Sequence, residues 1–435
     1  MKVWLDGTLV AKVQADPAEL GGGSIMHWDP MWRDYAQAQG LELSPLQAPL
    51  AKPWIQGPLG APYHGLPALL ADAMPEQFAN QVLRTWLQAQ GRGSDLTPLD
   101  RLSYVGGSGM GAMEFDRAST PELNAGIVSE SMLDRLDELG QLGHDVMHGS
   151  SVVGRSVNPD QDNLLTTLMH LGSSVGGAQP KILMSKTPLG WAATSAGVGA
   201  EPAARVSAEC PVPFIVKLAA VTSSPWGMEK TRVEYAYHQM AVEAGLDMMP
   251  CVLMGDSAHF ATQRFDRFMR PDGSSGKVHM QSLAAMVGWP GRQVYAYEDV
   301  FRLLHRLGAP HQDLVALFRH VAFQMCAACF DDHVKNLAFL MRPSGQFRLA
   351  PSYDLTFPAD PYHPILALHK MSLAGKQQGV TRADLERLAQ TVGIARSGPM
   401  LDAIESAVDH WPSLARALDL PRETIATISS YHGFG

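Results

Sequence analysis

A polar segment of eight residues, Phe330 to Leu337, is the feature that most constrains the fold of this chain. Residues 311–329 before it repeat apolar side chains at helical spacing. Two short apolar runs follow it, 337–341 and 346–349, separated by the turn sequence Pro343-Ser344-Gly345. A loop between a long helix and a β-hairpin is held at both ends. The sequence therefore predicts an α+β fold with ordered polar groups at this loop.

The spacing within this loop indicates phosphoryl transfer. Asp331 and Asn336 are five residues apart, the separation of the catalytic base and the metal-binding asparagine in protein kinases. A carboxylate can accept the proton of a hydroxyl nucleophile, and an amide oxygen can hold Mg²⁺. Asp354 follows at the end of the hairpin, where a second carboxylate for the metal is expected.

Two other readings of this region carry different chemistry. Asp331, Asp332 and His333 could be ligands of a metal-dependent phosphohydrolase, but the remaining histidines form no second half-site in the sequence. Cys326 and Cys329 have the spacing of a zinc or redox motif. No second cysteine pair follows, and both lie in an apolar helix, so we expect buried thiols.

Two earlier segments carry groups that could meet an anion. Gly176 and Gly177 precede an apolar strand that starts near Ile182, and such a loop can bring backbone N–H groups close to a phosphate or simply form a turn. Lys217 interrupts another apolar strand. A lysine there either meets an anion or faces water from an edge strand. A glutamate of the next predicted helix, Glu234 or Glu229, could orient it.

Size and charge limit the remaining possibilities. A chain of 435 residues exceeds a single core, and we divide it into an N-terminal subdomain (1–150), a strand-rich lobe (151–265) and a helical lobe (266–435). The net charge of −9 argues against nucleic-acid binding through overall charge. Four cysteines, a charged Asp6 in the opening segment and no apolar run of membrane-spanning length predict a cytoplasmic protein without a membrane contact.

Further elements are expected on each side of these motifs. The opening residues predict a hairpin around Asp6-Gly7, and residues 187–212 predict an irregular loop. Thr381 and Asp384 have the spacing of a capping box. The other expected helices are 78–91, 229–244, 299–307, 382–392 and 400–410, and the expected strands are 182–184, 214–216, 251–253 and 259–261.

Taken together, five segments resemble the HipA family, Ser/Thr protein kinases that are the toxins of HipBA-type toxin–antitoxin systems. These segments are SVGGAQPK (174–181), FIVK (214–217), QRFDR (263–267), DDHVKN (331–336) and PSYD (351–354). The resemblance implies a two-lobed protein-kinase-like fold with a strand-rich N-lobe, an extra N-terminal subdomain and a helical C-lobe.

The resemblance also implies roles for individual residues and the cofactors ATP and Mg²⁺. Asp331 would be the catalytic base, Lys217 would contact the phosphates, and Asn336 and Asp354 would bind the metal. Ser174 would be the autophosphorylated serine that switches the enzyme off, although Ser173 beside it is an alternative. The implied ATP-binding residues are Gly176, Gly177, Ala178, Gln179, Lys181, Lys217, Gln263, Arg264, Phe265, His333, Lys335, Asn336, Tyr353 and Asp354.

Two positions depart from the family pattern. Asp332 follows the base where the family often has glycine, which we expect to add negative charge near the metal. Gln263 stands in the hinge where glutamate is common, and we expect little effect because backbone groups make the contacts there. Neither change removes a required group, so we expect an active enzyme.

The resemblance implies growth arrest through phosphorylation of an aminoacyl-tRNA synthetase, glutamyl-tRNA synthetase in the best-known members. It also implies a HipB-like helix-turn-helix antitoxin as partner and, through that antitoxin, contact with promoter DNA. Two alternatives remain open at this stage. The same residues could phosphorylate a small molecule, or the chain could be a catalytically idle co-repressor scaffold.

Overall fold

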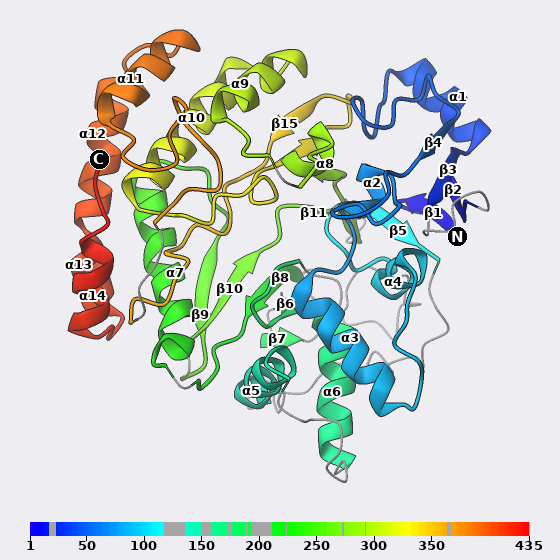
Figure 1. The fold of residues 1–435 in the computed structure, drawn as a ribbon, viewed down its shortest axis with the longest axis horizontal. Coiled ribbons are helices and arrows are strands. Elements are labelled where there is room, and N and C mark those ends of the chain that lie inside the picture. The colour runs from blue at the N-terminus through cyan, green and yellow to red at the C-terminus, as the bar shows by residue number, and fades with distance from the viewer. Residues whose placement is uncertain are drawn as a thin grey trace. The chain divides into compact units, whose positions relative to one another are not determined.

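The computed structural model describes residues 1–16, 23–116, 135–149, 159–172, 176–187, 190–192, 211–222, 224–256, 258–271, 274–291, 293–362 and 367–434. Contacts divide the chain into two units. Figure 1 labels the helices and strands of the chain. The first unit comprises Met1–Val221, Met254–Gln281 and Ala285–Gly288. The second unit comprises Thr222–Leu253, Ser282–Ala284 and Trp289–Gly435.

The first unit opens with an antiparallel sheet in the order β4-β3-β2-β1-β5. Its strands are β1 (Lys2–Leu5), β2 (Thr8–Ala15), β3 (Ser24–Trp28), β4 (Trp54–Gln56) and β5 (Met113–Phe115). The predicted hairpin is confirmed, because Leu5 pairs with Thr8 across a two-residue turn. Asp6 and Gly7 both have positive φ, 48° and 82°, as the tightest hairpin turn requires.

A second antiparallel sheet of this unit runs in the order β7-β6-β8-β10. Its strands are β6 (Lys181–Thr187), β7 (Gly190–Ala192), β8 (Val212–Lys217) and β10 (His259–Gln263), and a separate ribbon pairs β11 (Arg267–Met269) with β12 (Ser275–Lys277). The helices are α1 (Pro30–Gln39), α2 (Ala68–Ala71), α3 (Gln77–Ala89), α4 (Pro98–Val105), α5 (Leu136–Met147) and α6 (Pro159–Gly172). Helices α3, α5 and α6 pack on one another, and α6 also packs on β6.

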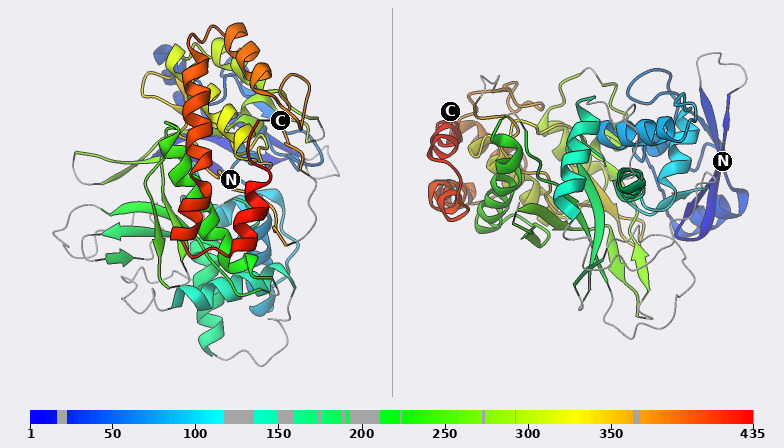
Figure 2. Two further views of the ribbon diagram at one scale, coloured as in Figure 1. Left: turned by 90° about the vertical axis from the view of Figure 1, so that its left-hand side faces the viewer. Right: turned by 90° about the horizontal axis from the view of Figure 1, so that it is seen from below.

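The second unit is mainly helical. Its elements are α7 (Trp226–Glu243), α9 (Tyr297–Arg306), α10 (His311–Cys326), the hairpin β14 (Ala338–Met341) and β15 (Phe347–Leu349), α11 (Arg382–Thr391), α12 (Ser397–Asp409), α13 (Trp411–Ala417) and α14 (Arg422–Ser429). Helix α10 is buried along most of its length, and α12 packs on it. Figure 2 shows the orange and red C-terminal helices beside green α7, which α12 and α13 contact.

Three elements lie where the chain passes between the two units in sequence: β9 (Cys251–Met254), β13 (Met280–Ser282) and α8 (Leu283–Val287). Within the described parts of the chain, no helix is both long enough and apolar enough to span a bilayer.

Most of the predicted elements are confirmed, including the capping box of Thr381 and Asp384 at α11. The elements that were not predicted are helices α1, α2, α4–α6, α8, α13 and α14 and strands β3–β5, β7 and β11–β13. Most of the loop predicted at 187–212 lies outside the described residues, and its described part includes β7. Two glycines in α5 lower its helix propensity, but close packing requires them. A Cβ at Gly140 would lie 2.2 Å from the Ala219 carbonyl oxygen, and one at Gly143 would lie 2.8 Å from Cβ of Pro180.

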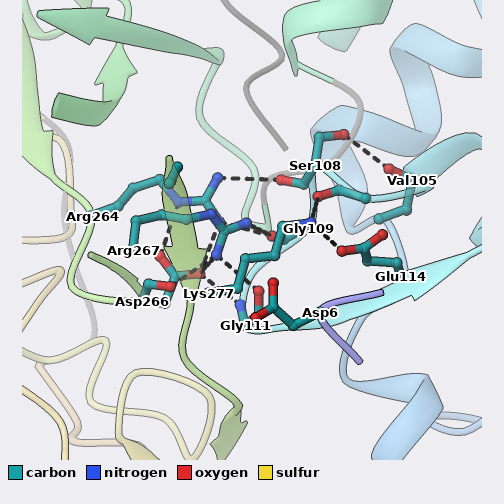
Figure 3. Close-up of polar contacts among 12 residues, drawn as sticks. Asp6, Val105, Ser108, Gly109, Gly111, Glu114, Arg264, Asp266, Arg267 and Lys277 are labelled. Carbon is teal, nitrogen blue, oxygen red and sulfur yellow. Dashed lines mark hydrogen bonds and ion pairs between the residues drawn. The ribbon is translucent and has the colours of Figure 1, made fainter. Parts of the chain in front are cut away.

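A buried ion cluster joins the end of β10 to the segment between α4 and β5 (Figure 3). Asp266 is fully buried and lies 2.8 Å from a guanidinium nitrogen of both Arg264 and Arg267. It also accepts a 2.6 Å hydrogen bond from the Gly111 N–H. The two arginines donate in turn to backbone carbonyls of Ser108, Gly109 and Gly111. Burial favours the neutral acid, but the two guanidinium groups prevail and hold the pKa of Asp266 well below its usual range.

Removing the charge of Asp266 is expected to destabilise the fold strongly. Asp266→Asn leaves two buried guanidinium groups without a carboxylate, a change that typically costs about 3–5 kcal/mol. Urea unfolding at neutral pH measures the loss. The matched control is Asp299→Asn, which breaks the exposed pair with Arg302 and should change the free energy of unfolding by less than about 1 kcal/mol. Equal effects of the two substitutions would contradict this account.

Candidate functional site

The glycine loop of the first unit lies directly ahead of β6 and is held in shape by its neighbours. Gly177 has a φ of 99°, a conformation that L side chains rarely adopt. Its carbonyl accepts from the Phe78 N–H at 3.1 Å, and its own N–H donates to the Glu76 carboxylate at 2.5 Å. Ala178 and Gln179 complete the loop, and the Pro180 carbonyl accepts from Leu218 N–H at 2.8 Å. The loop is therefore a defined turn with a carboxylate at one of its N–H groups.

Two lysines lie side by side on the sheet next to this loop. Lys181 of β6 and Lys217 of β8 are paired directly across the strands, so their side chains share one face. Each is 7% exposed. The Lys181 ammonium donates to the Gly176 carbonyl at 2.5 Å, and the Lys217 ammonium lies 5.9 Å from the ring centre of Phe260 on β10. These two ammonium groups place positive charge on one face of the sheet, next to the glycine loop.

The predicted hinge follows β10 and runs into the ion cluster. Gln263 is the last residue of β10, and the Arg264 N–H donates to the Pro213 carbonyl at 2.9 Å. The Arg264 side chain is committed to Asp266 and to backbone carbonyls, while Phe265 is half-buried. A ligand at this segment would therefore contact the backbone and Phe265. The Arg264 guanidinium stabilises the fold through its internal partners.

In the second unit, the predicted catalytic loop joins α10 to β14 as a tight turn. The His333 N–H donates to the Asp331 carbonyl, and the Asn336 N–H donates to the His333 carbonyl, both at 2.8 Å. The Asn336 side-chain amide donates to the Asp331 carbonyl at 2.9 Å, which leaves Oδ1 as the end that can face a cation. The Tyr353 hydroxyl donates to the Lys335 carbonyl at 2.6 Å. This bond ties the segment that carries Asp354 to the loop.

The neighbouring groups set the charge state of Asp331. Partial burial raises the pKa of Asp331, and the carboxylates of Asp354 and Asp332 raise it further, while His333 and Lys370 lower it; the net direction is upward. His333 Nδ1 accepts from the Lys335 N–H at 3.3 Å, so its proton lies on Nε2 when the ring is neutral. That nitrogen is 3.9 Å from Asp331 Oδ2. A carboxylate with a raised pKa is a stronger base, as proton abstraction requires.

The Asp332 carboxylate has internal hydrogen-bond partners that the sequence did not reveal. Its carboxylate is buried and accepts from the Tyr297 hydroxyl at 2.8 Å and from the Lys370 N–H at 2.6 Å. His369 Nδ1 lies 3.1 Å from it. Asp332 therefore holds the turn through these partners, and its negative charge also acts on Asp331, where it raises the pKa. Adjacent aspartates point to different environments because the turn directs one outward and one into the core.

Polar side chains connect Tyr297 to Ser352, two residues before Asp354. The Gln324 amide lies 2.8 Å from the Tyr297 hydroxyl and 2.5 Å from His320 Nε2, and His320 Nδ1 lies 2.9 Å from the Ser352 hydroxyl. Burial lowers the pKa of His320 to about 4. His320 is therefore neutral at pH 7. Through these hydrogen bonds it connects the two segments that carry predicted catalytic residues, 331–336 and 351–354.

The oxygen donors of this loop fit a magnesium ion. Asn336 Oδ1 and the Asp354 carboxylate are hard oxygen ligands, which Mg²⁺ prefers. Asp354 has a φ of 57°, which is uncommon for a residue other than glycine and is often found at functional positions. The Asp354 charge also acts on Asp331, so the two carboxylates are near each other.

The remaining sequence predictions concern the phosphorylated serine, the glutamate that orients a lysine, and the two cysteines. Ser173 and Ser174 lie outside the described residues. Glu229 accepts hydrogen bonds from Tyr362 at 2.8 Å and Thr424 at 2.6 Å within the second unit, so both of its oxygens have structural partners. Glu234 is buried in α7 and remains the candidate to orient a lysine. Cys326 and Cys329 are buried, and burial raises the pKa of Cys326 to about 12.

Sequence reasoning missed Glu76 entirely. It precedes α3, 101 positions from the glycine that it contacts, and no local pattern marks it. Asp332 and Gln324 were also missed as supporting groups. Only the apolar helical pattern around Gln324 hinted that a polar side chain there is buried and needs a partner.

Comparisons with known proteins agree with this layout. The profile of the HipA N-terminal domain matches residues 1–116, and that of the HipA-like C-terminal domain matches residues 173–415. "Putative kinase Y4mE" of Sinorhizobium fredii is 29% identical over 126 residues, which are 27% of this chain. That match spans only 30% of the relative's own length.

Among solved structures, HipA of Shewanella oneidensis MR-1, in a complex described as HipA, HipB and operator DNA, has a similar fold. The TM-score is 0.61, and the match covers 99% of this chain and 94% of that chain at 14% sequence identity. This likeness shows the fold.

Acid is expected to destabilise the chain through its buried histidines. Burial lowers the pKa of His320 and of His279 to about 4 from an ordinary 6.5. Between these values the unfolded chain binds protons that the folded chain does not, so stability is complete above pH 6.5 and falls toward pH 4. The loss is about 3 kcal/mol for each histidine. Urea unfolding between pH 7 and 4 should give a shallower pH dependence for His320→Gln.

The exposed His305 provides the control, since His305→Gln should leave that pH dependence as in the natural chain. An unfolding free energy that stays constant from pH 7 to 4.5 would contradict the assignment of neutral buried histidines.

Proposed function

The chain belongs to the HipA family, and from this premise we propose that it is a Mg²⁺- and ATP-dependent serine/threonine protein kinase with a two-lobed, protein-kinase-like arrangement. The observation that carries the proposal is the Asp331–Asn336 turn, which holds a carboxylate of raised pKa beside the oxygen donors Asn336 and Asp354. The base and the proposed metal ligands thus lie on this loop and on the segment that Tyr353 ties to it, as phosphoryl transfer requires.

Each residue then has a stated task. Asp331 orients the hydroxyl nucleophile and takes its proton. Asn336 and Asp354 would hold Mg²⁺, which when bound neutralises charge on the triphosphate. Lys217 and Lys181 contact phosphate oxygens. Glu234 orients Lys217, since Glu229 is engaged with Tyr362 and Thr424. The backbone of Gln263–Phe265 meets the adenine.

Family membership supports a proposal for the physiological role. We propose a toxin that phosphorylates an aminoacyl-tRNA synthetase of the glutamyl type and is switched off by autophosphorylation at Ser174. A HipB-like antitoxin would be its partner and its link to promoter DNA. The Shewanella complex of HipA with HipB and operator DNA supports this partner by analogy of fold.

Self-phosphorylation tests the kinase proposal directly. Phosphatase-treated protein is incubated with Mg²⁺-ATP and examined by intact mass and peptide mapping. The natural chain should gain phosphate at Ser174 or Ser173, and Asp331→Ala should slow this by about a hundredfold or more. Asp354→Ala should be similarly impaired through loss of the metal.

Asp402→Ala is the matched control, because Asp402 is an exposed partner of Arg382 and should not affect the reaction. A natural chain that neither binds ATP nor gains phosphate would sink the kinase proposal and favour the scaffold alternative. Nucleotide binding without self-phosphorylation would point to a small-molecule phosphotransferase.

The contact between Glu76 and the glycine loop predicts a second kinetic effect. A phosphate that binds the Gly177 N–H has to displace the Glu76 carboxylate, which also repels the triphosphate. Glu76→Gln should therefore lower the KM for ATP several-fold with little change in kcat. Glu138→Gln, at an exposed glutamate paired with Arg135, is the control. A raised KM would instead mean that Glu76 is needed to shape the loop.

A further inference from the structure

The first unit has a polar cavity that none of the proposed kinase-site residues lines. It has a volume of about 610 Å³ and lies between α3 and the segment that leads into α4. Its lining includes Gln81, Arg84, Gln88, Ser94, Asp95 and Arg101. This volume falls in the range of small-molecule sites.

Helical spacing brings one wall of the cavity together. Gln81, Arg84 and Gln88 lie three and four positions apart, so they form one polar stripe on α3. The opposite face of that helix, with Val82 and Trp86, is buried in the core. The stripe is therefore fixed in place by packing on its other side.

The second wall carries another arginine. Arg101 lies in α4, whose start is fixed by the capping box of Thr97 and Asp100. Burial lowers the pKa of Arg101, and the positive charge of Arg84 lowers it further, so the two guanidinium groups are close enough to repel each other. Like charges gathered in a cavity lower their energy when a shared anion binds between them.

Neither guanidinium has a hydrogen-bond or ion-pair partner among the residues that the structure describes. Some other arginines of the described chain do have partners: Arg264 and Arg267 pair with Asp266, and Arg348 pairs with Asp313. Two arginines in one lining gather positive charge in a chain with a net charge of −9. Guanidinium groups form paired hydrogen bonds with phosphate oxygens.

We propose that this cavity binds a small, hydroxyl-bearing phosphomonoester, with the phosphate between Arg84 and Arg101. The Asp95 carboxylate accepts hydrogen bonds from the hydroxyl groups of the ligand. The side-chain amides of Gln81 and Gln88 can donate to these hydroxyl groups or accept from them. Leu96 is the apolar residue in the lining, so an aromatic base has little to pack on. The ligand class is thus a phosphorylated sugar or polyol, at a site separate from the glycine loop.

Calorimetric titration of the full-length chain tests this site, with ribose 5-phosphate, ribose and inorganic phosphate as probes. Ribose 5-phosphate should bind more tightly than inorganic phosphate, and ribose alone should show no binding. Arg84→Ala and Arg101→Ala should each weaken ribose 5-phosphate binding about tenfold or more. Asp95→Asn should reduce the preference for ribose 5-phosphate over inorganic phosphate.

The matched control is Arg302→Ala, which removes an exposed arginine of α9 and should leave the affinity unchanged. Thermal melting of each variant shows that it is folded. The proposal is overturned if the natural chain fails to bind ribose 5-phosphate at millimolar concentration. It is also overturned if both arginine variants, folded, keep the natural affinity, since the phosphate would then bind elsewhere.

Discussion

The first unit depends on a carboxylate that is fully removed from water. Asp266 can stay ionised there only because Arg264 and Arg267 lie against it, and both arginines also donate to backbone carbonyls between α4 and β5. The cluster therefore fixes the backbone that leaves β10 (Figure 3). That backbone is the segment to which we assign the adenine of ATP. A rigid hinge costs no ordering entropy when a ligand binds.

In the second unit, a hydrogen-bonded network fixes the predicted catalytic loop. Asp332, Tyr297, Gln324 and His320 are buried and form a continuous polar chain that ends at the half-buried Ser352. In front of it, Asp331 remains exposed, with a pKa raised by partial burial and by neighbouring carboxylates. The division of labour between adjacent aspartates is what such a loop needs. The Asp332 carboxylate stabilises the turn, and the Asp331 carboxylate is accessible to a substrate.

The sequence was sufficient for the elements and motifs that have a local signature. The hairpin at Asp6-Gly7, helix α10 and the capping box at α11 all have a fixed spacing, and each is confirmed. What it could not provide are the partners. The contact of Glu76 with Gly177, the burial of Asp332 and the pairing of Arg264 with Asp266 arise from tertiary packing. Helix α5 was missed for the same reason, because its glycines serve close packing that no local pattern reveals.

The central proposal is that this chain binds Mg²⁺-ATP as a protein kinase does. Its most direct test is a crystal structure of the full-length chain with Mg²⁺ and a non-hydrolysable ATP analogue. We predict that the metal is bound by Asn336 Oδ1 and the Asp354 carboxylate, that Lys217 contacts phosphate oxygens, and that the Asp331 carboxylate faces the terminal phosphate. A nucleotide bound away from these residues, or none at millimolar concentration, would contradict the account.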